Sequence, residues 1–225
     1  MTIAVLGATG MVGSRVIDEA GARGHHVLAL SRRPPSEIPL NPLVTPIAVD
    51  ANDAHALHQA LAGSPSHGAA DAVVLTVRTL PVDEEFLVGA TRTVLDIAAR
   101  LGIRVLVVGG AGALRSPDDR ELLVADNPAY VPAGIRAVAA AGIAQLRTCQ
   151  SHAAADFVYL SPPALLEPGG RTGRYRRGTD TLLISADGRS WISAEDLAVA
   201  VIDELETPGP DDLITVVHRD EHPPA

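Results

Sequence analysis

The chain contains no lysine, because all 18 of its basic residues are arginines. This absence excludes a Schiff-base lysine, a phosphate-binding-loop lysine and any lysine that assists a catalytic tyrosine. Arginine stays protonated in proteins, so it binds anions well but is a poor general base. The basic residues therefore indicate anion binding rather than lysine-dependent catalysis.

Cysteine, aromatic residues and long apolar runs are also scarce. The single cysteine, Cys149, excludes an intrachain disulfide and fits a reducing compartment. Aromatic residues make up only 3% of the chain, so Ala, Val, Leu and Ile must form the core. No apolar run reaches the roughly 18 residues of a membrane span, and the first ten residues lack a basic leader. These features predict a cytoplasmic protein that does not bind membranes.

Charge and length narrow the class of partner. The net charge of -9 disfavours nucleic acid, whose phosphates are bound mainly by cations. We therefore expect a small-molecule substrate, and a monomer and a homodimer both remain open. A chain of 225 residues predicts one domain over 1–225. Within it we expect a cofactor-binding core at about 1–153 and a substrate region at about 154–225.

Short apolar runs alternate with segments of helical periodicity. Apolar runs of this length are typical of parallel strands buried on both faces. The predicted strands are 2–6, 26–30, 44–49, 72–76, 103–108, 156–160, 182–185 and 213–217. The predicted helices are 11–23, 54–61, 84–100, 135–150 and 193–206. This order predicts an α/β fold of the Rossmann type: a doubly wound, mostly parallel sheet with helices on both faces and a small C-terminal region that covers the substrate.

The strongest motif is Gly-Ala-Thr-Gly-Met-Val-Gly at 7–13, which directly follows the first predicted strand and opens the first predicted helix. In such a turn Gly7 permits a tight bend, Gly10 lets the backbone approach a pyrophosphate, and Gly13 allows close packing of helix on strand. The anion lies at the positive end of the helix, among free N–H groups. The residues predicted to bind the dinucleotide here are Gly7, Thr9, Gly10, Met11, Val12 and Gly13.

The residues after the second predicted strand bear on the choice between NAD and NADP. An acidic residue there would accept a hydrogen bond from the ribose 2′-hydroxyl of NAD, but the chain reads Ser31-Arg32-Arg33. Guanidinium groups bind phosphate through paired donors, so the two arginines fit the 2′-phosphate of NADP. The sequence favours NADPH, and the alternative is that this segment is a solvated loop.

The ends of the later strands complete the expected site, because ligands of open α/β sheets bind beyond the carboxyl ends of the strands. Asp50 follows the third predicted strand, where a side chain can reach adenine. Glycines after the fifth strand would let nicotinamide or substrate lie against the backbone. The candidates after the fourth, fifth and sixth predicted strands are Thr76, Val77, Arg78, Gly109, Gly110, Ala111 and Pro162.

Four segments, at 7–13, 107–112, 168–176 and 192–198, resemble the atypical short-chain dehydrogenases. Within that group the chain is similar to the NADH-flavin reductases, and more distantly to biliverdin-IXβ/flavin reductase and the NmrA-like proteins. The resemblance implies a bound NAD(P)H, usually NADPH, and hydride transfer to a flavin or another flat conjugated acceptor. One departure is Ala113, which stands where relatives usually have a serine, so a hydroxyl that could orient the substrate or donate a proton is missing.

The choice of candidate catalytic residues depends on the absence of a tyrosine–lysine pair. None of the three tyrosines is followed by lysine four positions later, which excludes the tyrosine–lysine pair of typical short-chain dehydrogenases. Hydride transfer to an electron-poor ring needs mainly orientation. We predict that Tyr130, Tyr175 and Arg78 contact the substrate, in that order. Alternatively, Tyr130 is a packed loop residue and Arg78 pairs with a cofactor phosphate or with Asp83.

Two further groups of residues are candidates for an anion-binding site and a metal site. Arg171, Arg174, Arg176 and Arg177 form a basic segment that would attract an anionic substrate or the phosphate of a flavin nucleotide, or would be a solvated hairpin. His55 and His58 lie three positions apart on a predicted helix, but no third ligand is placed nearby, so we expect no metal site.

The sequence as a whole predicts an NADPH-dependent oxidoreductase that transfers hydride to a flavin, with FMN or FAD as substrate, or to a similar flat conjugated molecule. Two alternatives remain open. One is an NADP-binding redox sensor without turnover, which Ala113 and the missing tyrosine–lysine pair favour. The other is a non-redox isomerase, dehydratase or cyclase that keeps the nucleotide as a scaffold.

Overall fold

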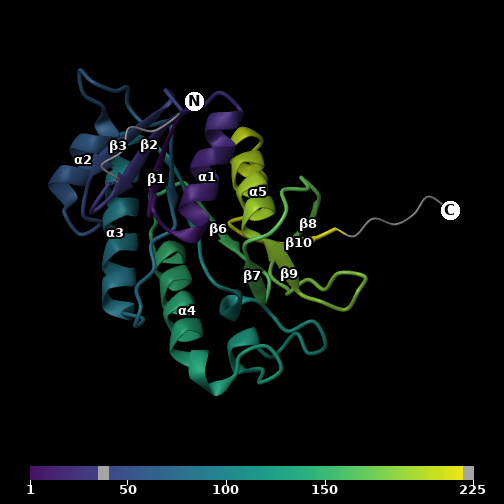
Figure 1. Cartoon of the computed structure of the whole chain (residues 1–225). Coiled ribbons are helices and arrows are strands. Elements are labelled where there is room, and N and C mark those ends of the chain that lie inside the picture. The colour runs from purple at the N-terminus through teal and green to yellow at the C-terminus, as the bar shows by residue number, and fades with distance from the viewer. Residues whose placement is uncertain (35–40, 220–225) are drawn as a thin grey trace.

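Strands and helices alternate along the chain in the computed structural model, which describes residues 1–34 and 41–219 (Figure 1). The strands are β1 (Thr2–Leu6), β2 (His26–Ser31), β3 (Val44–Ala48), β4 (Ala72–Leu75), β5 (Arg104–Val108), β6 (Phe157–Ser161), β7 (Leu165–Glu167), β8 (Tyr175–Gly178), β9 (Trp191–Ser193) and β10 (Leu213–His218). The α-helices are α1 (Met11–Ala22), α2 (Ala54–Ala62), α3 (Glu84–Leu101), α4 (Arg136–Gln150) and α5 (Ala194–Glu206). Three 3-10 turns, η1 (Ala111–Ala113), η2 (Val124–Asp126) and η3 (Ala133–Ile135), separate β5 from α4.

Eight strands form one mostly parallel sheet in the order β3-β2-β1-β4-β5-β6-β10-β8. β1 pairs in parallel with β2 on one side and with β4 on the other. Only β8 runs antiparallel to its neighbour, β10. The direction of strand order reverses between β1 and β4, and ligands of such sheets bind at this switch point, beyond the carboxyl ends of the strands. The predicted Rossmann-type fold is confirmed.

Helices cover both faces of the sheet. Figure 1 shows α1 and α5 side by side, and their apolar residues pack with one face of the strands, as Val16 of α1 and Leu197 of α5 do. Leu57 of α2, Val94 of α3 and Leu146 of α4 pack on the other face. Both cores consist mainly of Ala, Val, Leu and Ile, as the shortage of aromatic residues predicts. None of the described helices is long and apolar enough to span a bilayer.

The C-terminal part of the chain differs from the prediction. Residues 182–185 are not a strand: Leu182 is buried in a small cluster with Leu114 and Val124, so its apolar character reflects packing beneath loops. β7, β8 and β9 were missed. β7 and β9 have only three residues each, and β8 exposes two arginines because it lies at the edge of the sheet.

Candidate cofactor and substrate site

The glycine turn between β1 and α1 leaves no room for side chains. Gly7 has a φ of +98°, and a Cβ there would lie 2.6 Å from Oγ1 of Thr76. A Cβ on Gly13 would collide with the carbonyl of Gly7 and lie 2.9 Å from the same Thr76 oxygen. Helix, turn and β4 are therefore in contact through backbone atoms, which exposes the start of α1 at the carboxyl edge of the sheet.

The first turn of α1 has donors without acceptors. Gly10 donates its N–H to the carbonyl of Gly7 at 2.9 Å, and the first N–H of the helix with a partner is that of Ser14, which donates to the carbonyl of Gly10 at 3.0 Å. The N–H groups of Met11, Val12 and Gly13 have no partner among the described residues. The first turn contains no acidic residue, and Gly10 offers no side-chain cap. Unpaired N–H groups at a helix N-terminus form a binding site for phosphate.

Thr76, which we expected to contact the cofactor, holds the turn together. Its hydroxyl donates to the carbonyl of Leu6 at 3.1 Å, beside the carbonyl of Gly7 at 3.4 Å. Val77 is half-buried against the core, whereas Arg78 is exposed and forms no ion pair within the described chain. Asp83 is not its partner, because the Asp83 carboxylate accepts the N–H of Phe86 and begins α3.

The end of β2 is arranged as a polar site. The hydroxyl of Ser31 is buried and lacks a hydrogen-bond partner among the described residues. Arg32 and Arg33 follow it, are exposed, and form no ion pair within that part of the chain. Asp50 is exposed after β3, and its carboxylate accepts the N–H of Asn52 at 2.9 Å. The guanidinium groups of Arg32 and Arg33 are therefore available to bind an anion.

The glycines after β5 occupy their positions for different structural reasons. A Cβ on Gly109 would collide with the phenol of Tyr159, and one on Gly112 would lie 2.9 Å from the Cβ of Ala139. Internal packing therefore accounts for these two. At Gly110, in contrast, no atom of the described residues lies within 4 Å of an added Cβ, so its backbone faces open space. Ala111 follows in η1, and Pro162 is buried after β6.

Tyr159 is a structural residue that the sequence did not reveal. Its hydroxyl donates to the carbonyl of Gly142 at 2.9 Å and lies 3.3 Å from Oε1 of Gln145, both on α4. Burial raises the pKa of Tyr159, so the phenol stays protonated. The bulk of this ring explains Gly109 and fixes α4 against β6. The only sequence signal is a phenol within the apolar part of a strand that reads Phe-Val-Tyr-Leu-Ser.

Tyr130 and Tyr175 lie in different surroundings. Tyr130 packs beside the cluster that contains Leu114, and burial, with the charge of Asp118, raises its pKa. The Tyr175 hydroxyl donates to Asp203 at 2.7 Å, and Asp203 also accepts from Arg23. Arg23 follows the end of α1, about 18 Å along the helix from the glycine turn. The structure does not bring Tyr175 to that turn.

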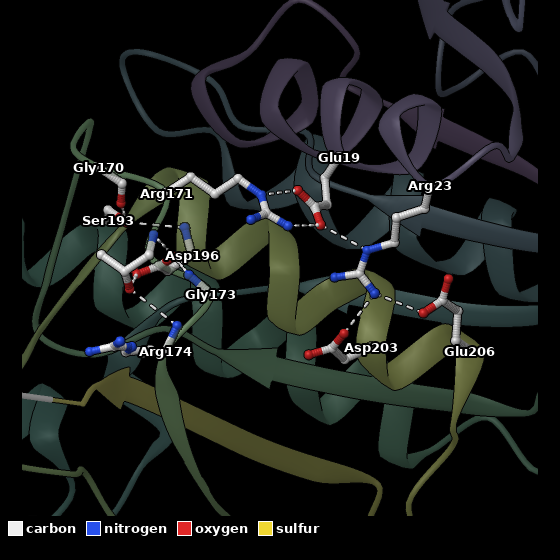
Figure 2. Close-up of polar contacts among 11 residues, drawn as sticks. Glu19, Arg23, Gly170, Arg171, Gly173, Arg174, Ser193, Asp196, Asp203 and Glu206 are labelled. Carbon is white, nitrogen blue, oxygen red and sulfur yellow. Dashed lines mark hydrogen bonds and ion pairs between the residues drawn. The ribbon is translucent and has the colours of Figure 1, made fainter.

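Much of the basic segment is paired with internal carboxylates. Arg171 binds Glu19 of α1, as Figure 2 shows, and Arg177 binds Glu204 and Asp211. The hydrogen bond from Arg171 holds the pKa of Glu19 below its usual value despite burial. The interpretation of these two arginines as an anion-attracting patch is not supported, because their charge is used inside the protein.

The family follows from a comparison of the whole sequence. Residues 7–208 match the model of the NAD(P)H-binding family. The chain belongs to this family. The geometry fits the cofactor: three glycines leave room for a pyrophosphate at N–H groups, and two arginines follow β2, none of these groups having a partner among residues 1–34 and 41–219.

Several proteins are similar to this NAD(P)H-binding protein over nearly their full length. The uncharacterized protein YwnB of Bacillus subtilis is 32% identical over 212 residues, 92% of this chain and 93% of YwnB. A Bacteroides thetaiotaomicron protein, provisionally named an epimerase, is 32% identical with a TM-score of 0.85 over 99% of both chains. A Burkholderia pseudomallei protein, provisionally named an exported protein, is 34% identical with a TM-score of 0.83 over 97% of this chain and 100% of its own.

Reductases occur among structures that share the fold at lower identity. A Streptococcus pneumoniae protein, provisionally named an NADH-flavin reductase, is 24% identical with a TM-score of 0.77, covering 97% of this chain and 99% of its own. The anaerobilin reductase ChuY of Escherichia coli O157:H7 is 21% identical with a TM-score of 0.74 over the full length of both chains. The predicted resemblance to the NAD(P)H-binding family is confirmed, and the likeness to these two reductases shows a shared fold.

Proposed function

We propose that the protein transfers hydride from NADPH to a flavin, such as FMN or FAD, or to a comparable flat conjugated acceptor. The observation that carries this proposal is the bare backbone at Gly110. It lies after β5, two strands and about 10 Å from the phosphate-binding turn after β1. A nicotinamide ring and a flat acceptor can approach backbone there without meeting a side chain of Gly110. The fold shared with two reductases supports the same reaction class.

The reaction needs little from the protein beyond orientation. A hydride, with two electrons, leaves C4 of the NADPH nicotinamide and bonds to an electron-poor atom of the acceptor. NADP⁺ is released, and one proton from solvent completes the reduced acceptor. Because the chain lacks the tyrosine–lysine pair, this proton need not come from a dedicated side chain. We keep Tyr130 and Arg78 as proposed substrate contacts and assign Tyr175 to the network around Asp203.

The preference for NADPH over NADH is part of the proposal. Arg32 and Arg33 stand at the end of β2 with no carboxylate partner in the described chain. Their paired donors suit the 2′-phosphate that distinguishes NADP from NAD. No acidic residue directly follows β2 to accept a hydrogen bond from the 2′-hydroxyl of NAD. NADPH is therefore the proposed physiological donor.

The test is to incubate the purified protein with NADPH and to follow the loss of its absorbance after FMN, FAD or a quinone is added. We expect oxidation that requires both protein and acceptor, and slower oxidation of NADH at the same concentration. Calorimetry with NADPH alone measures binding independently of turnover. Binding without oxidation by any of these acceptors would contradict the reductase proposal and support the sensor, whereas product formation without net NADPH loss would support a non-redox enzyme.

We further propose that the protein acts on small molecules in the cytoplasm, without a nucleic-acid or membrane partner. The negative net charge and the single buried cysteine support this view. Analytical ultracentrifugation distinguishes a monomer from a homodimer. Fractionation of cells that produce the full-length protein tests the compartment.

A further inference from the structure

One helical stripe of α4 is buried along most of its length but exposed at its start. Val138, Gly142, Gln145 and Cys149 follow one another at spacings of four, three and four residues, so they share a face of the helix. The last three are buried against the sheet. Val138 is 37% exposed, and Ile135, directly before α4, is 45% exposed. The face of α4 that packs on the sheet thus continues for one turn beyond the sheet.

Gly142 marks the level at which this stripe leaves the sheet. A Cβ on Gly142 would lie 3.8 Å from the backbone N of Gly110 and 3.8 Å from the Tyr159 hydroxyl. Gly142 therefore stands beside the carboxyl end of β5. Because α4 runs from that edge toward β6, Val138 lies one turn, about 6 Å, farther out than Gly142. By helical spacing, its side chain lies on the same face of α4 as Gly142, one turn nearer the start of the helix.

We propose that Val138, flanked by Ile135, is the apolar wall against which the ring of the electron acceptor lies, and that it determines which acceptors bind. This inference rests on the proposed function, because it places the acceptor over Gly110. Val138 lies one turn beyond the part of α4 that packs on the sheet, and its 37% exposed surface is available for contact with a ligand. The occupant that suits an aliphatic wall beside bare backbone is a flat, largely apolar ring.

The wall also limits the chemistry of the acceptor. Val138 and Ile135 carry no ionisable group, and none of the chain's tyrosines is followed by a lysine four positions later. An acceptor on this wall takes hydride from NADPH, which becomes NADP⁺, and takes its proton from water. Flavins and quinones are reduced in this way, whereas a simple ketone lacks the proton donor that its developing alkoxide needs. The inferred substrate class is therefore flavin or quinone, not aliphatic carbonyl.

The experiment compares Val138→Asp with Ala137→Asp. Both substitutions add one negative charge in the first turn of α4, where an acid is compatible with the helix dipole. Ala137 is exposed and points about 100° around the helix from Val138, so it controls for stability and for long-range repulsion of phosphates. We measure KM and kcat with FMN and with menadione, the dissociation constant for NADPH, and the quenching of FMN fluorescence by protein saturated with NADP⁺.

We expect Val138→Asp to raise the KM or dissociation constant for FMN and menadione by about tenfold, the effect of losing a buried valine contact. Its affinity for NADPH should stay within about twofold of the wild type, as should all constants of Ala137→Asp. Equal effects of the two substitutions would overturn the inference, as would no effect of either. If the wild type oxidises no NADPH, the proposed function fails. Fluorescence quenching then tests separately whether Val138 contacts the acceptor ring. Tenfold weaker FMN binding by Val138→Asp supports that contact, and unchanged or absent FMN binding overturns it.

Discussion

Arg171 and Glu19 are joined by two parallel hydrogen bonds. Nε and Nη2 of the guanidinium lie 2.6 Å and 2.8 Å from the two carboxylate oxygens. Glu19 lies on α1 and is 4% exposed, and Arg23 binds the same carboxylate at 2.7 Å on its other side (Figure 2). The helix whose first turn is the proposed phosphate-binding site is thereby linked to the C-terminal region.

Glu19→Gln should destabilise the protein. Loss of a buried, doubly paired carboxylate costs about 2 kcal/mol in the free energy of unfolding at neutral pH. The matched control is Asp18→Asn on the exposed side of the same helix, which should change that free energy by less than about 0.5 kcal/mol. Urea unfolding followed by circular dichroism measures both. Equal stability of the two variants would show that the ion pairs contribute nothing net.

The contribution of Glu19 should depend on pH. Its pKa in the folded protein lies below the ordinary value of 4.5, so the stability it provides is fully present above that value. As the pH falls below 4.5 the unfolded chain takes up the proton first, and the advantage is lost as the pH passes through the folded pKa. We expect the difference between wild type and Glu19→Gln to shrink in acid. A constant difference down to acid unfolding would contradict this origin.

Replacement of Arg32 and Arg33 by alanine should weaken NADPH far more than NADH. The loss of contacts with the 2′-phosphate predicts a reduction in NADPH affinity of about 100-fold and a change in NADH affinity of less than about threefold. Isothermal titration calorimetry measures both constants. Arg92→Ala combined with Arg100→Ala, on α3, removes the same charge elsewhere and should leave both affinities unchanged. Equal losses for the two nucleotides would contradict the 2′-phosphate assignment.

Substitution by alanine should reduce mainly stability at Gly109 and mainly activity at Gly110. Gly109→Ala places a methyl group on the Tyr159 ring and should cost more than about 2 kcal/mol of stability. Gly110→Ala has space, and its extended backbone suits any residue, so stability should change by less than about 1 kcal/mol. The new methyl group should nevertheless reduce kcat/KM by at least about tenfold. Full activity of a folded Gly110→Ala would indicate that neither ring approaches this backbone.

Tyr130 and Tyr175 can be separated by their phenylalanine variants. Tyr130→Phe should lower kcat/KM for the acceptor by about three- to tenfold, the loss of one hydrogen bond to the substrate. Tyr175→Phe should leave kcat and KM within about twofold and reduce stability by about 1 kcal/mol, because Asp203 loses a donor. Steady-state kinetics and urea unfolding measure these effects. A lower kcat for Tyr175→Phe without loss of stability would restore it as a catalytic candidate.

The N-terminal two-thirds of the fold could be predicted because each element there has a strong local signal. β1, the glycine turn and α1 follow one another in 22 residues, and the cap Asp53 accepts a hydrogen bond from the third residue of α2. Such signals depend only on neighbouring residues. They needed no knowledge of which strands become neighbours.

What the sequence could not reveal depends on contacts between distant residues. The reason for Gly109 lies 50 positions away in Tyr159, and the arginines of the basic segment meet acids on α1 and α5. Leu182 has the apolar character of a strand residue but packs beneath loops. Nothing in the residues around Val138 distinguishes it from the rest of its helix, and the position of Gly142 beside Gly110 shows which turn of α4 extends past the sheet.

Both borders of the eight-stranded sheet discourage further strand addition. β3 carries Pro46, which lacks an N–H to donate, and β8 carries the paired arginines Arg176 and Arg177. A second molecule that tried to extend either border would meet a missing donor or a row of charge. We therefore expect this protein to resist fibril formation when concentrated, and any association between copies to use helical surfaces instead.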